Sequence, residues 1–325
     1  MKAAIGQQLA QTLFNGSIAR ADRAHIFAAY GGGMHIGHSN ISLFSVNSVC
    51  AVGRNRQTAA ASAAIIYKPT VAQTAKLNFL LRRREMTHLL CHTDPETMRC
   101  DAKITAWGED EKGNWIAVDR TVFYPQGGGQ MSDRGTLTLG EQTLTCQLAL
   151  QRDGAVRHYL TDLPDNLKPE APLRLAIDAP FRLMASRSHS AGHLISHVVE
   201  TLRPGLIPDK GHHFLPGAYV AFQGELADDA ERFLRLVQQQ VEAAIAASLP
   251  VRIGAGSFSD IAALRPELAD KIPQQAQIRT VTIGDYRPFA CGGTHVPHSG
   301  AIGALALRKI KVKNGVRISY ELLTD

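Results

Sequence analysis

Short runs in which apolar and polar residues alternate follow one another from about Asp101 onward. Alternation with a period of two residues is typical of strands with one buried face, and Gly- and Asp-rich turns separate the runs. The predicted strands are Ala102–Trp107, Trp115–Val118, Thr136–Leu139, Thr143–Leu150, Val156–Leu160 and Leu173–Ile177. Residues 101–178 are therefore predicted to form a small antiparallel barrel or sandwich.

A different periodicity begins after Pro180. Apolar residues recur at helical spacing in Phe181–Leu202, which is followed by Pro204-Gly205, and again in Asp228–Ser248. Further strands are predicted around Tyr219–Phe222, Val251–Ile253, Arg279–Ile283 and Leu305–Val312. The pattern therefore predicts an α+β protein in which a small barrel precedes a mixed region of helices and strands.

Residues 1–85 show neither period and are rich in Ala, Ser and Asn. They hold ten Lys and Arg but only two acidic residues, and three explanations fit this bias: sequence upstream of a misassigned start, an organellar transit peptide, or an accessory segment. Subtracting them from the totals of 35 basic and 29 acidic residues leaves 25 and 27 in the other 240. A polyanion-binding surface on this main part must therefore be a local patch.

One charge run is a candidate for such a patch, with a solvated strand face as the alternative interpretation. Its members are Arg308, Lys309, Lys311, Lys313 and Arg317. The five cysteines are irregularly spaced and no secretory signal precedes them, which argues against a disulfide framework and favours a reducing cytoplasm. No run reaches the roughly 18 apolar residues that span a bilayer, so we expect no membrane partner.

The sharpest local motif is an HxxxH formed by His189 and His193 inside the first predicted helix. Two histidines four residues apart on a helix project from the same side and can bind one metal ion. They fall on the side opposite the apolar stripe, which consists of Ala191, Leu194, Ile195, Val198 and Leu202. His197 continues the histidine side and is an alternative ligand. A zinc protease would need a glutamate directly after the first histidine, where this chain has Ser190.

A second motif, CGGTH, supplies a thiolate at Cys291 and an imidazole at His295, separated by two glycines that let the backbone turn tightly. Pro288 and Pro297 place the motif on a loop. A plain glycine turn with a buried cysteine is the alternative for this motif alone. Together the two motifs offer three nitrogens and one sulfur, a set that suits Zn²⁺.

A glycine-rich segment, residues 119–135, lies between the predicted strands and includes Gly127-Gly128-Gly129. No Gly-Lys-Ser/Thr follows and no βαβ pattern surrounds it, so a nucleotide-binding loop is not predicted. This segment, followed by HxxxH and then CGGTH, resembles the editing half of alanyl-tRNA synthetases and the freestanding alanyl-tRNA editing proteins. The resemblance covers about residues 86–325, and Met86 with Asp94-Pro95 resembles the start of the medium-length freestanding group.

The resemblance implies a β-barrel domain at residues 86–178 and a zinc-binding editing domain at residues 179–325, similar in fold to one in threonyl-tRNA synthetases. The positions that match the family's zinc ligands are His189, His193, Cys291 and His295. Thr121 and Gln130 match groups that line the amino-acid pocket, and Cys291 joins them as a candidate catalytic residue. The segment Lys210-Gly211-His212-His213-Phe214 is richer in histidine than the family pattern leads us to expect.

The implied function is hydrolysis of the ester that joins serine, or glycine, to alanine tRNA, with Ala-tRNA(Ala) left intact. Thr121 is the expected partner of the serine hydroxyl, and Gln130 is expected to orient the substrate. Because no synthetase-type ATP motif is apparent, we expect hydrolysis without ATP. Two other classes are carried forward: a zinc-containing module that binds tRNA without chemistry, and a zinc hydrolase for another small ester.

Overall fold

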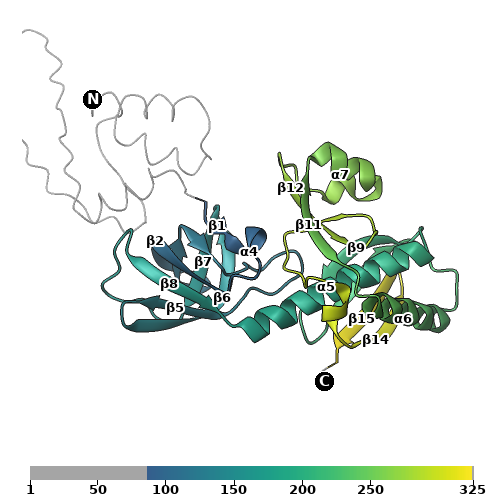
Figure 1. Ribbon diagram of the computed structural model, residues 1–325, viewed down its shortest axis with the longest axis horizontal. Helices are drawn as coiled ribbons and strands as arrows, with labels where there is room; N and C mark the ends of the chain where they lie inside the picture. Colours follow the sequence, from purple (N-terminus) through teal and green to yellow (C-terminus); the bar gives the residue numbers. More distant parts are fainter. Residues whose placement is uncertain (1–85, 324–325) are drawn as a thin grey trace, which may run out of the picture. The chain divides into compact units, whose positions relative to one another are not determined.

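The computed structural model describes residues 86–323, and the hypotheses about residues 1–85 lie outside them (Figure 1). Six antiparallel strands close into a barrel in the order β2-β3-β7-β6-β5-β8. Their bounds are β2 Arg99–Asp110, β3 Gly113–Val118, β5 Gly135–Leu139, β6 Gln142–Arg152, β7 Ala155–Leu160 and β8 Pro172–Ile177. All six predicted strands are confirmed, and closure of the barrel removes the unpaired strand edges of an open sheet.

The barrel is filled by the apolar residues that alternate along these strands. Ile104, Val118, Leu137 and Leu175 are almost completely buried in one cluster. Three short elements beside the barrel were not predicted: β1 (His88–Leu89), β4 (Arg120–Thr121) and α4 (Leu90–Thr93). The two short strands pair in parallel, so that the start of the described chain lies against the beginning of the glycine-rich segment.

Helix α5 (Ala179–Leu202) follows the barrel directly and is the predicted first helix. The side chain of Asp178 caps it by accepting a hydrogen bond from the backbone N–H of Phe181. Pro180 lies in the first turn, where its missing N–H leaves no helical hydrogen bond unmade. One side of the helix packs into the main core through Ala191, Leu194, Ile195 and Val198. On the histidine side of α5, His189 and His197 are buried and His193 is partly buried, and this side forms the site described below.

A four-stranded antiparallel sheet, in the order β14-β15-β10-β9, packs against α5 and α6. The bounds are α6 Ala230–Ala246, β9 Ile207–His212, β10 Tyr219–Gln223, β14 Leu305–Val312 and β15 Val316–Leu322. The predictions for α6, β10 and β14 are confirmed, whereas β9 and β15 were not predicted. Val220 and Ile318 represent the buried face of this sheet, which shares its core with both helices.

A second sheet consists of three short strands in the order β11-β12-β13. The bounds are β11 Val251–Gly256, β12 Ile278–Ile283 and β13 Phe289–Ala290, with α7 Phe258–Leu264 and the 3-10 helices η1 Pro266–Lys271 and η2 Ser299–Ile302 nearby. The α+β class is confirmed. Division of the chain into domains at residue 178 stays a prediction. Within residues 86–323 no helix is long and apolar enough to cross a membrane.

Candidate metal centre

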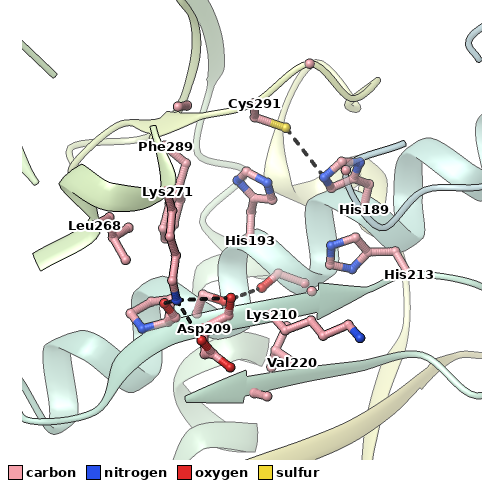
Figure 2. A pocket seen from close by; sticks show the side chains of 18 of the residues that line it. His189, His193, Asp209, Lys210, His213, Val220, Leu268, Lys271, Phe289 and Cys291 are labelled. Atoms are coloured by element: carbon pink, nitrogen blue, oxygen red, sulfur yellow. Dashed lines mark hydrogen bonds and ion pairs between the residues drawn. The ribbon is translucent and has the colours of Figure 1, made fainter. Parts of the chain in front are cut away.

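Four side chains from two distant segments meet at one point of the structure. They are His189 and His193 on α5, and Cys291 and His295 on the loop after β13. Figure 2 shows His189, His193 and Cys291 turned toward one another. One potential ligand atom from each lies within 4.8 Å of all the others. Cys291 Sγ is 3.5 Å from His189 Nε2 and 3.4 Å from His295 Nε2. The cluster therefore has the dimensions of a site that can hold a metal ion.

The helix half of the cluster is oriented by the glycine-rich segment. His189 Nδ1 lies 2.6 Å from Oε1 of Gln130, and since that oxygen can only accept, Nδ1 carries the proton. The lone pair is then on Nε2, the nitrogen that faces Cys291. A histidine that donates one ring N–H to a fixed acceptor while its other nitrogen faces a shared point is the usual arrangement around a metal. Gln130 therefore selects the tautomer that a ligand needs.

The loop half is held by Arg279 on β12. The backbone N–H of Cys291 donates to the carbonyl of Arg279 at 3.0 Å. In return, Arg279 Nη1 donates to the carbonyls of Cys291 at 2.7 Å and Gly293 at 3.0 Å. A Cβ added to Gly293 would lie 2.0 Å from Cε1 of His189, so the close approach of loop and helix requires glycine at this position. Three hydrogen bonds thus fix the loop where the helix can meet it.

The last histidine of the cluster has its own partner. Ser190 Oγ accepts a hydrogen bond from the backbone N–H of Val296 at 3.1 Å and lies 3.0 Å from His295 Nδ1. A hydroxyl oxygen has two lone pairs, and the second one can receive a proton carried on His295 Nδ1. With this assigned tautomer, Nε2 of His295 faces Cys291 as a lone pair. Ser190, which stands where a zinc protease has glutamate, therefore serves the cluster as an orienting group.

Burial sets the protonation of the cluster. It lowers the pKa of His193 to about 3, with Arg265 and Arg279 adding to the effect. It also holds the pKa values of His189 and His295 well below the usual value, with neighbouring histidines adding to the effect. The three imidazoles are therefore neutral at pH 7, the form that binds metals. Burial also raises the pKa of the Cys291 thiol to about 11, opposed by the Gly293 N–H and by Arg279. A cation at the centre would favour the thiolate.

The fit of the cluster to a metal ion rests on an unpaired atom and on the donor set. Nδ1 of His193 is buried and lacks a hydrogen-bond partner among residues 86–323. Leaving a buried polar atom unpaired costs about 1–3 kcal/mol. Neutral imidazoles together with a sulfur are soft and borderline donors, the kind that first-row transition metals prefer. His197 Nε2 is also buried without a partner in the described residues, but its ring stacks on Tyr286 and it does not join the other donors. The meeting of four donor atoms within 4.8 Å of one another is what distinguishes the cluster, so the residues present fit a bound metal ion.

A cavity of about 380 Å³ adjoins the cluster. His193, Cys291 and Phe289 line it near the cluster, and Lys210 and Lys271 line it among exposed residues (Figure 2). Lys271 Nζ donates to Asp209 Oδ1 at 2.7 Å, and this hydrogen bond lowers the pKa of Asp209. The cavity therefore combines an apolar and imidazole-lined end with a charged rim.

The structure does not bring Thr121 into this cavity. Its side chain is completely buried beside the barrel core, and its Oγ1 accepts the N–H of Phe123 at 3.0 Å. The same oxygen lies 2.8 Å from Nε2 of His158, whose Nδ1 is 3.1 Å from the carbonyl of Ile116. The proton of His158 is therefore on Nδ1 and the Thr121 hydroxyl donates to Nε2. The expected contact of Thr121 with a serine hydroxyl is not supported, because the hydroxyl is already engaged twice.

Gln130 reaches the cluster, but in a different role from the expected one. Its side chain is completely buried. Oε1 accepts hydrogen bonds from His189 Nδ1 and from the backbone N–H of Thr294, and Nε2 donates to Thr294 Oγ1 at 2.8 Å. Both polar atoms are thus used by the protein. Gln130 joins the glycine-rich segment, the helix and the loop, so it positions ligands rather than facing the cavity.

Two further histidines, His197 and His213, were considered as additional ligands, and they lie in different surroundings. His197 is not part of the cluster, since its ring stacks on Tyr286 at 4.8 Å and lies 4.7 Å from Phe289. His213, from the unusual segment, stacks on His189 at 4.4 Å and lines the cavity. Its Nδ1 is 2.7 Å from the hydroxyl of Tyr320, which donates to the carbonyl of Ser188. The segment therefore adds a cavity wall, not a fifth ligand.

Arg279 is the site residue that the sequence interpretation missed. It lies in a predicted strand and is partly buried, and the only sign in the sequence is a charge among apolar neighbours close to CGGTH. Nε and Nη2 of Arg279 are buried without a hydrogen-bond partner in the described part of the chain. Burial lowers its pKa, and Cys291 opposes that effect. The guanidinium therefore lies close enough to the thiol to act on its charge.

The sequence is similar to known proteins over the part of the chain that holds these motifs. Residues 278–318 match the family described as the threonyl and alanyl tRNA synthetase second additional domain, a range that includes Cys291 and His295. The alanyl-tRNA editing protein AlaX-L of Pyrococcus horikoshii is 27% identical over 243 residues, which cover 72% of this chain and 58% of that protein. The chain is similar in sequence to this alanyl-tRNA editing protein. The resemblance predicted from the motifs is confirmed, and membership of the medium-length group stays a prediction.

Alanine–tRNA ligases are similar to the same part of the chain. The ligase of Halorubrum lacusprofundi is 30% identical over 246 residues, or 71% of this chain and 25% of the ligase. The ligase of Salinispora tropica is 30% identical over 204 residues, or 62% of this chain and 23% of the ligase. The chain thus spans about a quarter of the length of these ligases and just over half of the editing protein.

Proposed function

We propose that the chain is a zinc-dependent aminoacyl-tRNA deacylase that removes serine, and also glycine, from mischarged alanine tRNA while sparing Ala-tRNA(Ala). The observation that carries this proposal is the four-residue cluster beside a cavity of about 380 Å³. Similarity to an alanyl-tRNA editing protein supports tRNA as the partner. The reaction adds one water across the ester bond and releases the amino acid and the tRNA 3′ end. A reducing cytoplasm remains the expected compartment.

Three neutral imidazoles and one thiolate form a donor set that suits zinc. His189, His193, Cys291 and His295 would hold the ion, and Gln130, Ser190 and Arg279 would keep three of these ligands in place. When bound, zinc supplies a positive charge that stabilises negative charge developing on the ester oxygens. The imidazole-lined end of the cavity is then the place for the aminoacyl group, and the charged rim faces the tRNA.

The selection of serine over alanine requires a polar contact. An apolar pocket rejects an added hydroxyl only weakly. A site that hydrogen-bonds the hydroxyl can favour serine over alanine by about 10⁴-fold. Gln130 and Thr121 act in this proposal as positioning residues. Gln130 orients the ring of His189 through a hydrogen bond. Thr121, near the start of the glycine-rich segment, accepts a hydrogen bond from the N–H of Phe123 and so fixes the backbone of that segment against the barrel. The hydroxyl partner is therefore sought among the groups that line the cavity.

Deacylation of Ser-, Gly- and Ala-charged alanine tRNA tests the proposal. Wild-type protein should release serine and glycine but not alanine, and a chelator should remove the activity, which zinc should restore. Cys291→Ala should lose both bound zinc and activity, whereas Cys100→Ser, a matched change in the barrel strand β2, should keep both. Full activity of the Cys291→Ala variant would refute the assignment. Tight tRNA binding with intact Ser-tRNA would instead identify a non-catalytic zinc module, and hydrolysis of small esters without tRNA another hydrolase.

A further inference from the structure

The exposed face of the sheet β14-β15-β10-β9 carries a row of basic residues. Strand pairing sets Lys311 of β14 opposite Arg317 of β15, Arg317 opposite Ala221 of β10, and Ala221 opposite Lys210 of β9. Directly paired residues project from the same face of a sheet. The neighbouring row, through Ile310, Ile318 and Val220, projects from the other face, into the core with α5 and α6. The basic row therefore lies on the face turned away from both helices.

The cations of this row lack ion-pair partners among residues 86–323. Lys210, Lys311 and Arg317 are exposed, and residues 86–323 provide none of them with an ion-pair partner. Like charges directly opposite each other destabilise a sheet, and Lys311 and Arg317 form such a pair. The main part of the chain has slightly more acidic than basic residues, so the row does not simply reflect a basic composition. Such an arrangement is stabilised by an anionic partner.

A row of planar side chains runs beside the basic row. The guanidinium of Arg317 lies 3.5 Å from the ring centroid of Tyr219, and the ring of His212 lies 5.2 Å from the ring of Tyr219. Phe214 stacks on His212 at 4.6 Å. Tyr219, His212 and Phe214 are partly exposed. Single-stranded nucleic acid is bound by this combination, in which cations contact phosphates and planar groups stack with bases.

The basic row ends at the cavity. Lys210 and Ala221 belong to the row and also line the cavity beside the metal cluster. Strands lie about 4.8 Å apart, so the row from β14 to β9 spans roughly 14 Å. A row of this length can face more than one phosphate of a nucleic-acid strand. An RNA strand on this face would lead its end into the cavity.

We propose that this basic face, defined by Lys210, Lys309, Lys311, Arg317, Tyr219 and His212, binds the 3′-terminal strand of the tRNA acceptor arm and guides the aminoacyl end into the cavity. An acidic protein or an anionic membrane would use the cations but not the planar row. Lys309 belongs here because its paired residues, Ser319, Tyr219 and His212, continue along the same face. The identity of the RNA rests on the proposed function, whereas the binding of RNA by this face does not.

The test removes two cations that do not line the cavity. The double variant Lys311→Gln/Arg317→Gln is compared with Arg232→Gln/Arg235→Gln, which removes the same charge from the exposed side of α6. Dissociation constants for uncharged alanine tRNA are measured over a range of salt concentrations. We expect the first variant to bind roughly tenfold more weakly and to lower the salt slope by about 0.7–0.9 per lost phosphate contact, while the second binds like wild type.

Kinetic measurements separate this proposal from the proposed function. With Ser-tRNA(Ala), the face variant should raise KM roughly tenfold and keep kcat and zinc content, and it should hydrolyse seryl-adenosine like wild type. Lys309→Gln/Lys311→Gln, which keeps the Arg317–Tyr219 stack, provides a second test should the first variant unfold. Unchanged tRNA affinity and salt slope, or an equal loss in the α6 control, would overturn the proposal. Wild-type protein that binds tRNA through this face without deacylating it would overturn only the deacylase function.

Discussion

Histidines are buried in two regions of this protein, and their ring nitrogens are treated differently. In the barrel, His158 has Nε2 on Thr121 and Nδ1 on the carbonyl of Ile116. In the cluster, His189 and His295 each use Nδ1 for a protein partner, and Nε2 of each faces Cys291. Burial lowers the pKa in both regions, to about 4 for His158. Burial and a low pKa therefore do not by themselves identify a ligand.

The barrel and the cluster differ in whether both ring nitrogens of a histidine are hydrogen-bonded to oxygen atoms of the protein. In the barrel, both ring nitrogens of His158 have a hydrogen-bond partner, so no nitrogen is available for a metal ion. The cluster histidines and Cys291 bring four donor atoms within 4.8 Å of one another, which is the arrangement of ligands around an ion. Changes that disturb convergence should therefore affect metal binding, and changes to the barrel chain should affect only stability.

The largest effect is expected from Gly293→Ala. A Cβ there would lie 2.0 Å from Cε1 of His189 and 2.9 Å from Oε1 of Gln130, so the ring must turn away and the ligands no longer converge. A displacement of about 1 Å in a site costs on the order of 100-fold in rate. We expect a loss of that size in deacylation of Ser-tRNA(Ala), with zinc content reduced.

Gly292→Ala is the matched control for this prediction. A Cβ at Gly292 would have its nearest neighbour, Nε2 of His92, at 3.7 Å, an ordinary contact distance. Because Gly292 also lines the cavity, the comparison uses zinc content, which this variant should keep at the wild-type level. Equal losses in both variants would show that loop flexibility matters, rather than convergence of the two halves.

A smaller effect is expected from Gln130→Met, which keeps the volume of the side chain but removes the acceptor for His189. Replacement of such an outer partner lowers metal affinity by about 10–100-fold. Competition with a zinc-binding dye measures this loss, and a thermal scan reports on folding. If Gln130 contacted the substrate instead, as its position in the motif first indicated, KM would rise with zinc affinity unchanged. That result would overturn its role as a positioning residue.

The barrel strands, the helices α5 and α6 and the four residues of the cluster could be predicted from the sequence because each leaves a local pattern. Barrel strands alternate with period two, α5 has an apolar stripe, and both histidines of HxxxH lie on its other side. CGGTH combines two donors with glycines that allow a tight turn. Spacing along one segment cannot show that the two motifs meet, and the resemblance to a known family provided that step.

The missed features depend on contacts between distant segments. Strand β9 contains Pro208 and Gly211 and has no alternating pattern, yet it pairs with β10. The hydrogen bonds of Arg279 with the CGGTH loop join residues that lie on different strands and turns. Thr121 was placed in the pocket from its position in a motif. Its actual partner, His158, is 37 residues away in the chain, so no local pattern could reveal the link.

The smallest effect is expected from Thr121→Val, and it separates the two regions most cleanly. Valine has nearly the same shape but neither donates to His158 nor accepts the N–H of Phe123. Each buried polar group left unpaired costs about 1–3 kcal/mol, and two lose their partner, so the free energy of unfolding in urea should fall by at least about 2 kcal/mol. Thr121→Ser keeps the hydroxyl and should lose less stability. Zinc affinity should stay the same in both variants, because no bond of the barrel chain reaches the cluster. A selective loss of serine over alanine discrimination in Thr121→Val, at unchanged stability, would instead mean that the hydroxyl turns toward the substrate.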